Sequence, residues 1–467
     1  MLPDDVLLAI FYFCADEDSE QDTKNDIEAW QSLVHVSQRW RSVVFGSPCR
    51  LNLRLVCTEK THVRDKLCIW PPLSLVIQSE ASLTKDVDNI IAVFELRDRV
   101  DRIELFEVNS SPLEMILAAM QKPFPELLFM RLESDDKTVP VLPDSLLGGS
   151  APRLGYLWLD GIPFPGLPKL LLSSTHLYNL ILLDIPHSGY ISPEAIVTAL
   201  SSLTDLESLA LEFQSPLSHP GRASRRPPPP TRTVLPVLVY FSFKGVYEYL
   251  DDLVARIDAP QVNLYITFFN DIVFDAPQLI QFIGRTPSLE SLKNAHVVFG
   301  DGHVTVKSSQ TSDYGIYGSL TIKISCRELD WQVSSLEQVY TSCLPPLSAL
   351  EDLLIYKTRD WLPDRQDNTE NMLWLELLHQ FTAVKHLYLS KEFAPRIVPA
   401  LQELVGARTT EVLPALQNIF LEELQSSGPI QEGIGRFVGA RRLSGHPMTV
   451  SLWEREPESD YLREVYD

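Results

Sequence analysis

One spacing of apolar residues recurs along most of the 467-residue chain and limits what it can fold into. Leucine or another apolar residue stands at positions one, four and six of a short frame. The clear frames begin at Val100, Leu127, Leu154, Leu177, Leu206, Leu238, Leu350, Val384 and Leu416. Positions four and six alternate with polar residues as in a β-strand. Each frame therefore predicts a short strand with one apolar side.

Helical segments are expected between these strands. First positions lie 23 to 29 residues apart between Leu127 and Leu206, which is the period of leucine-rich repeats. Stretches with apolar residues every three to four positions fill the intervals at 112–121, 192–202, 247–257, 276–284, 336–344, 372–381 and 394–405. The order strand, helix, strand predicts an α/β solenoid, a horseshoe in which each repeat covers the apolar side of its neighbour.

The predicted repeats are irregular. The asparagine of the strict leucine-rich repeat is missing, and Ile162, Ile185 and Gln214 stand at its place. Weaker frames at Val262 and Leu289 fill the central part of the chain. A generic α/β domain with leucine-rich strands is the alternative interpretation.

The first 50 residues have a different, helical period. Pro3 suits the first turn of a helix, where a missing N–H has no partner, and Asp4 and Asp5 follow at its positive end. A second apolar set with helical spacing runs through 27–44, and the acidic stretch 16–26 between the two sets predicts a loop.

This N-terminal stretch resembles an F-box. The resemblance lies in Leu2-Pro3, the helix of Val6, Leu7, Ile10 and Phe11, and then Leu33-x-x-Val36-x-x-x-Trp40-Arg41. It covers about a tenth of the chain, and the ending through Pro48 is similar to fungal members of the family. The family docks on the Skp-type adaptor of a cullin–RING ubiquitin ligase. The resemblance therefore implies adaptor contacts by Leu2, Pro3, Leu7, Ile10, Phe11, Leu33, Val36 and Trp40.

The predicted strands also suggest a surface for a target protein. Positions three and five of each frame should point away from the core leucines, because side chains alternate along a strand. These positions hold many aromatic residues, which are typical of contact surfaces. The tentative target-binding residues are Phe129, Arg131, Tyr156, Trp158, Tyr240, Tyr356, Tyr388 and Phe420. Packing of these side chains against one another or beneath loops is the alternative.

These patterns divide the chain into three parts. Residues 1–50 form the helical F-box-like segment, 51–453 the solenoid, and 454–467 an acidic tail. Polar insertions are expected at 215–233, 300–318 and 359–369. The first contains Pro227–Pro230 and is either a plain surface loop or a ligand for a proline-reading domain. The second is a candidate hairpin with the strand at 320–324.

Charge and cysteine usage restrict the partners and the compartment. The formal net charge of −22 disfavours binding to nucleic acid or to anionic membranes. Six cysteines without a Cys-x-x-Cys pair are typical of free thiols, so a cytoplasmic or nuclear location is expected. Cys49, Cys57, His62 and Cys68 match no common zinc spacing. We expect no metal and no cofactor.

No catalytic motif is recognisable. Gly433, Gly435 and Gly439 imitate a dinucleotide loop, but the third glycine comes one position late and no βαβ unit surrounds it. The resemblance implies a non-enzymatic subunit that holds an unknown target protein for a Skp–cullin–F-box ligase. The alternatives are a leucine-rich-repeat scaffold whose N-terminal helices only cap the solenoid, and an enzyme whose site lacks a familiar motif.

Overall fold

The computed structural model divides the chain into two compact units, Met1–Gln214 and Ser215–Asp467. It describes residues 2–15, 29–48, 51, 53–60, 70, 72–79, 87–136, 138–216, 231–269, 276–290, 292–310, 318–342, 349–358, 370–404, 406–422 and 428–454. The predicted loop at 16–26, most of the insertion at 215–233, the insertion at 359–369 and nearly all of the acidic tail lie outside these residues. The same holds for three members of the discounted zinc set, Cys49, His62 and Cys68.

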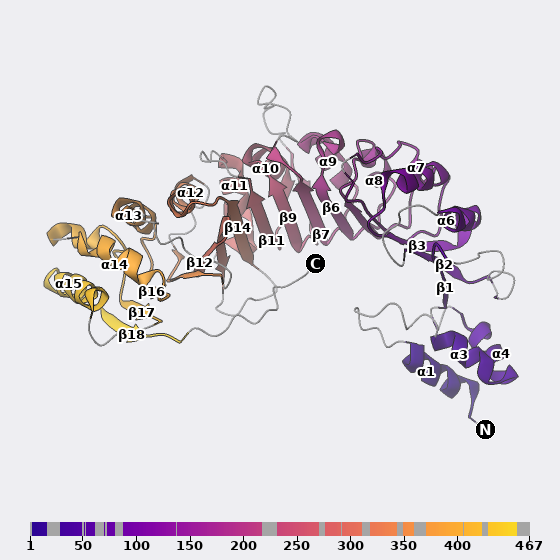
Figure 1. The fold of residues 1–467 in the computed structure, drawn as a ribbon, viewed down its shortest axis with the longest axis horizontal. Helices are drawn as coiled ribbons and strands as arrows, with labels where there is room; N and C mark the ends of the chain where they lie inside the picture. Colours follow the sequence, from indigo (N-terminus) through magenta and orange to yellow (C-terminus); the bar gives the residue numbers. More distant parts are fainter. Residues whose placement is uncertain are drawn as a thin grey trace. The chain divides into compact units, whose positions relative to one another are not determined.

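Three helices begin the first unit: α1 (Asp4–Ala15), α3 (Ala29–Val36) and α4 (Gln38–Gly46) (Figure 1). The second apolar set was expected to have one helical period, but the structure breaks it at Ser37. Ser37 has an extended backbone, and its hydroxyl oxygen accepts a hydrogen bond from the backbone N–H of Trp40 at 3.1 Å. This bond caps a new helix and explains the break, because serine satisfies an otherwise unpaired first-turn donor.

Seven strands follow in the first unit and pair in chain order, all parallel. They are β1 (Arg54–Cys57), β2 (Ser74–Gln78), β3 (Val100–Leu105), β4 (Phe129–Glu133), β5 (Tyr156–Asp160), β6 (Asn179–Ile185) and β7 (Ser208–Phe213). The helical connections are α6 (Asp88–Val93), η1 (Phe94–Arg99), α7 (Ser110–Ala119), η2 (Leu146–Gly149), α8 (Leu167–Leu171), η3 (His187–Gly189) and α9 (Pro193–Leu200).

The register of these strands confirms the sequence frame in the first unit. Position-four residues of successive repeats lie side by side, as with Met130 beside Leu157 and Leu157 beside Leu180. All three are fully buried. An α/β fold with a parallel sheet is therefore present, and each strand covers the apolar side of the next, as a solenoid requires.

The second unit continues the pattern with β8 (Thr233–Val234), β9 (Tyr240–Gly245), β10 (Ile257–Asp258), β11 (Asn263–Phe268), β12 (Asn294–Gly300), β13 (His303–Ser309), β14 (Ser319–Ser325), β15 (Asp352–Lys357), β16 (His386–Leu389), β17 (Asn418–Leu421) and β18 (Thr449–Leu452). Its helical elements are α10 (Tyr247–Val254), α11 (Pro277–Arg285), η5 (Pro287–Leu289), α12 (Leu329–Ser342), α13 (Asn371–His379), α14 (Ala394–Gln402), η7 (Gly406–Thr410) and α15 (Pro429–Leu443).

The second unit departs from simple repetition at one place. Strand β13 lies between β12 and β14 and pairs antiparallel with both, so the spatial order is β9-β11-β14-β13-β12-β15-β16-β17-β18. The candidate hairpin with 320–324 is confirmed, but residues 303–309 form a central strand rather than a polar insertion. Buried Val304, Val306 and Ser308 alternate with the outward positions and explain this strand.

A second departure concerns residues 429–443. They form α15, a fifteen-residue helix, although the sequence interpretation expected no helix there. The three discounted glycines, Gly433, Gly435 and Gly439, all lie within this helix rather than in a loop. Three glycines in a short interval lower helix propensity, so packing must stabilise the helix. Ile434 and Phe437 provide a buried side for that packing.

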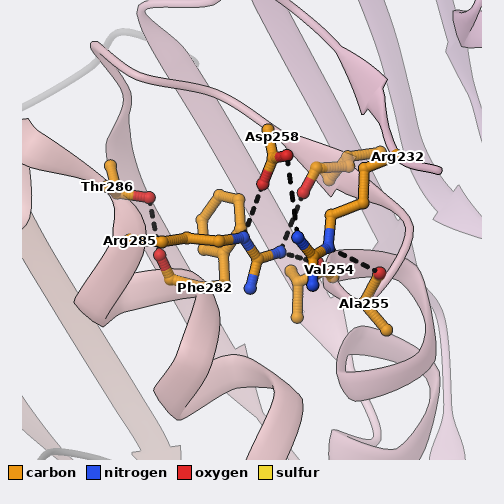
Figure 2. Close-up of polar contacts among 8 residues, drawn as sticks. Arg232, Val254, Ala255, Asp258, Phe282, Arg285 and Thr286 are labelled. Carbon is orange, nitrogen blue, oxygen red and sulfur yellow. Dashed lines mark hydrogen bonds and ion pairs between the residues drawn. The ribbon is translucent and has the colours of Figure 1, made fainter. Parts of the chain in front are cut away.

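Arginine and aspartate join successive repeats on the helical side of the second unit (Figure 2). Arg285, at the end of α11, donates to the Asp258 carboxylate at 2.5 Å and to the backbone carbonyl of Val254, the last residue of α10, at 2.5 Å. Arg232 donates to the carbonyl of Ala255 at 3.3 Å. The end of α10 is thereby tied to the next repeat and to β8, because each guanidinium binds carbonyls left open at the helix end.

Candidate functional site

An exposed apolar stripe runs along α1. Val6, Ile10 and Phe13 follow one another at intervals of four and three residues, which places them on one side of the helix, and exposed Leu2 lies just before the helix begins. Their exposed fractions are 51%, 41%, 42% and 75%. Val36, at the end of α3, is also exposed. Exposed apolar side chains at helical spacing are typical of a surface that another polypeptide covers.

Six of the eight residues predicted to contact an adaptor are at least partly exposed, and two are buried. Leu2, Pro3, Ile10 and Val36 are exposed, and Leu33 and Trp40 are half-buried. Leu7 and Phe11 are buried, so the prediction that they contact a partner directly is corrected. The Phe11 ring lies 4.7 Å from that of Trp40, so the two residues hold α1 against α4. A helical segment this small needs such side chains for its own core.

The helical segment also contacts the residues that follow it. The Trp30 ring lies 5.1 Å from that of Trp70, and the Phe45 ring lies 6.1 Å from Trp70. Trp30 is buried, whereas Trp70 and Phe45 are half-buried. These aromatic contacts attach α3 and α4 to the start of the repeat region. They do not involve the exposed apolar residues of α1.

The outward side of the first unit's sheet carries a ladder of stacked aromatic and arginine side chains, which we call the ladder face. The rings of Phe129 and Tyr156, on neighbouring strands, are stacked at 4.2 Å with 10° between their planes. The guanidinium of Arg102 lies 4.4 Å from the centre of the Phe129 ring, and that of Arg131 lies 4.1 Å from Trp158. The parallel register produces this stacking, since it places Phe129 beside Tyr156 and Arg131 beside Trp158.

Carboxylates gather at the end of this face where β4 to β7 end. Glu133 lies beside Asp160 in the register, and Asp135, Asp184 and Glu212 are also close enough to affect Asp160. Burial, followed by the charges of these four carboxylates, raises the pKa of Asp160 from 3.8 to about 6. The end of the ladder face is therefore a region of negative potential.

This raised pKa predicts a pH-dependent stability. Native Asp160 holds its proton up to about pH 6, whereas unfolded Asp160 loses it near 3.8, so its contribution to stability falls as pH rises from about 4 to 6. Asp160→Asn should therefore stabilise the chain at pH 7 by about 1 kcal/mol, a value reduced because the group is partly exposed. Chemical unfolding at pH 4 and pH 7 measures this. A gain at pH 7 from Asp330→Asn, an exposed control, would contradict the assignment.

The eight predicted target-binding residues are placed unevenly. Phe129, Arg131, Tyr156, Tyr240, Tyr388 and Phe420 are half-buried on the outward side of the strands. Trp158 and Tyr356 are buried, with exposed fractions of 6% and 2%, so their predicted exposure is corrected. Neighbouring strands lie only about 4.8 Å apart, so large side chains in register cover one another.

Sequence reasoning missed Arg102, Asp160, Asp184 and Glu212. The sequence does contain a pattern that predicts part of this set. Glu133, Asp160 and Glu212 all stand at position seven of their frames. A recurring carboxylate there predicts an acidic end of the sheet. Asp184 has no such signal, since it belongs to an irregularity in β6 and has a φ of 41°.

The outward side of the second unit has similar stacking but a different charge. Tyr388 and Phe420 stack at 4.5 Å, and the rings of Tyr240 and Tyr265 lie 4.9 Å apart. Three half-buried lysines occupy outward positions of β9, β13 and β14: Lys244, Lys307 and Lys323. The described outward positions of these three strands and β11 hold no carboxylate. The outward side of these four strands therefore carries basic side chains, whereas carboxylates gather where β4 to β7 end.

A pocket of about 340 Å³ lies beside α14 and α15. Its lining is mainly aliphatic and includes Leu421, Ile430, Ile434, Val438 and Val450. Within the described residues no group of three histidine, cysteine or carboxylate side chains could hold a metal ion. In the same part of the chain, no helix has the length and apolar character needed to span a membrane.

Comparisons with known proteins leave the family open. No family model matches the sequence, and no curated protein matches it. Similar solved structures include the leucine-rich repeat-containing protein LegL7 from Legionella pneumophila, which is 13% identical. The match covers 83% of this chain and 98% of that chain, with a TM-score of 0.29.

Proposed function

We propose that this chain is the substrate-recognition subunit of a Skp–cullin–F-box type ubiquitin ligase. The observation that carries the proposal is the exposed apolar stripe formed by Leu2, just before α1, and by Val6, Ile10 and Phe13 on α1, in a segment whose sequence resembles an F-box. Opposite this stripe, Phe11 packs on Trp40, so the helices have a core of their own and still leave apolar side chains exposed. An adaptor that covered the stripe would remove this apolar surface from water.

The proposed mechanism is proximity rather than bond chemistry. The N-terminal helices would hold the adaptor, while the outward side of the sheet would hold a target protein. Binding both at once raises the effective concentration of a target lysine near the ubiquitin-loaded enzyme. The chain itself supplies no catalytic group in this proposal. The stacked and ion-paired side chains of the ladder face support the target-binding part, because they form a surface that is rigid before binding.

Adaptor binding should depend on the exposed stripe. We expect Ile10→Glu to weaken binding to a purified Skp-type adaptor at least tenfold, because the change removes about 1.5–3 kcal/mol of apolar burial and places a charge in the contact. The measurement is biolayer interferometry between the full chain and the adaptor. Ile10 is exposed, so this change spares the core that Trp40→Ala would disturb.

Met115→Glu provides a matched control. Met115 has an exposed fraction of 41%, nearly that of Ile10, but it lies on α7. The control should bind the adaptor as the unchanged chain does. Equal binding by Ile10→Glu and the unchanged chain, or no binding by either, would reject the adaptor-docking proposal.

A scaffold without an adaptor is the second candidate function. It is favoured by one observation, the attachment of α3 and α4 to the repeat region through Trp30, Phe45 and Trp70. In that case the N-terminal helices would cap the sheet, and the stripe on α1 would have no adaptor to bind. The adaptor measurement separates the two candidates directly.

A further inference from the structure

We propose that the pocket beside α14 and α15, which we call the α15 pocket, binds a small molecule with an unbranched aliphatic chain and a polar end. Its lining includes Leu421, Ile430, Ile434, Val438 and Val450. The pocket lies within the second unit, whereas the apolar stripe proposed for the adaptor lies at α1 in the first. The proposal therefore goes beyond the proposed function and can be tested without the adaptor.

The walls of the α15 pocket come from four elements of the last repeats, α14, β17, α15 and β18 (Figure 1). Ala394 at the start of α14, Leu421 at the end of β17 and Ile434 on α15 are buried and form its inner side. The half-buried wall residues are Ile430, Val438 and Val450. Because helices and strands both contribute walls, the site is a hollow between the two layers. Such a hollow suits a small molecule, whereas a protein partner needs a much wider contact area.

The size and length of the pocket set the size of the ligand. Its volume of about 340 Å³ lies at the lower end of the range for small-molecule sites. If a methylene group takes roughly the 30 Å³ of a water molecule, the pocket holds about ten such groups. The lining on α15 runs from Ile430 to Val438, which is roughly 12 Å along the helix axis. The elongated lining favours an extended chain over a compact ring.

The side chains around the pocket determine the chemical class of the ligand. Its walls are aliphatic, and the described lining contains no aromatic ring on which a planar ligand could stack. Lys391 and Gln431 are its long polar side chains, and both are exposed. The described lining contains no carboxylate, so a cationic end group would gain no ion pair there. An aliphatic chain inside the pocket, with a neutral or anionic end left in water, fits this arrangement.

Gly435 leaves one side of the pocket without a side chain. It lines the pocket on the same side of α15 as Gln431 and Val438, since residues three and four apart lie together on a helix. Nothing lies within 4 Å of a Cβ atom built on Gly435. By contrast, a Cβ atom on Gly433 would come within 2.7 Å of Val398 on α14, so close helix packing explains that glycine. A larger residue at Gly435 would therefore fill part of the pocket.

Calorimetric titration of the full chain with 1-octanol tests this inference. We expect saturable binding to the unchanged chain. Gly435→Leu should weaken this binding at least tenfold, because the added side chain occupies space that the alkyl chain needs. Leucine also favours a helix more than glycine does, so the variant should remain folded, and circular dichroism checks this.

Gly439→Leu is the matched control. Gly439 lies one turn further along α15, nothing lies within 4 Å of its Cβ position, and it is not part of the described lining. The two variants therefore make the same chemical change on the same helix. Gly439→Leu should change the affinity for 1-octanol less than twofold.

Probes of other lengths and shapes identify what the pocket recognises. From 1-hexanol to 1-octanol the affinity should rise about tenfold, because each buried methylene strengthens binding severalfold. Cyclooctanol has the same number of carbon atoms in a compact ring and should bind at least threefold more weakly than 1-octanol. Octylamine, a cation at pH 7.4, should also bind more weakly than 1-octanol, because the described lining offers it no carboxylate.

Four results would overturn the inference. They are no binding of 1-octanol to the unchanged chain, equal weakening by Gly435→Leu and Gly439→Leu, binding of cyclooctanol as tight as that of 1-octanol, and tighter binding of octylamine. None of these results affects the proposed function, because the stripe proposed for the adaptor lies at α1.

Discussion

Gly161→Ala is expected to destabilise the chain by about 3 kcal/mol, a cost that combines backbone strain with steric overlap. Gly161 follows β5 directly and has a φ of +68°, where residues with a side chain are strained. A Cβ atom there would come within 2.1 Å of the Ser134 carbonyl oxygen, and a backbone atom cannot move aside as a flexible side chain can. The free energy of unfolding from urea titration measures the effect.

Gly302→Ala separates the two contributions. Gly302, in the turn between β12 and β13, has a φ of +72°, but nothing lies within 4 Å of its Cβ position. This control should lose only about 1 kcal/mol, the cost of the backbone conformation alone. Equal losses at the two glycines would show that the close approach of the chain to Gly161 has no energetic consequence. The backbone N–H of Ser134 donates to the carbonyl of Asp160, the residue before Gly161, at 3.1 Å, and this hydrogen bond holds the two backbone segments close together.

Arg441→Met is expected to cost about 3 kcal/mol or more, because it keeps an unbranched apolar side chain and removes the donors. Arg441 lies on α15 and is fully buried. It donates to the backbone carbonyls of Thr409 at 3.2 Å, Pro414 at 3.3 Å and Leu416 at 2.9 Å. Burial lowers the pKa of Arg441 from its ordinary value. The three carbonyls would be left in the protein interior without these bonds.

Arg436→Met serves as the control for Arg441. Arg436 lies on the same helix and is exposed, so the two changes remove the same charge from the same element. We expect a loss below about 0.5 kcal/mol for Arg436, as is usual for surface substitutions. Differential scanning calorimetry and urea titration compare the variants. Similar losses in both would indicate that α15 depends on its net charge and that the three carbonyl bonds contribute little.

The repeat strands were predictable because each depends on local alternation of apolar residues. Met130, Leu157 and Leu180 could be placed in neighbouring strands from spacing alone, and the structure buries all three side by side. The sequence predicts that the segment before 320–324 pairs with it as a hairpin, but the central place of β13 between β12 and β14 depends on pairing with both strands, which local alternation does not specify. Helix α15 is not predicted from its sequence because its three glycines oppose a helix locally, whereas the contacts of buried Ile434, Phe437 and Arg441 favour it.

The sequence by itself determined which residues form strands and which side of each strand is buried, because both follow from intervals of a few residues. It also placed an apolar period on the first helix. Only the tertiary structure decided that Leu7 and Phe11 face inward while Ile10 and Phe13 remain exposed, and that Trp158 is covered by its neighbours. These outcomes depend on the register between strands and on the packing of helices, which connect residues far apart in the chain. The spacing of apolar residues within one segment does not determine these outcomes.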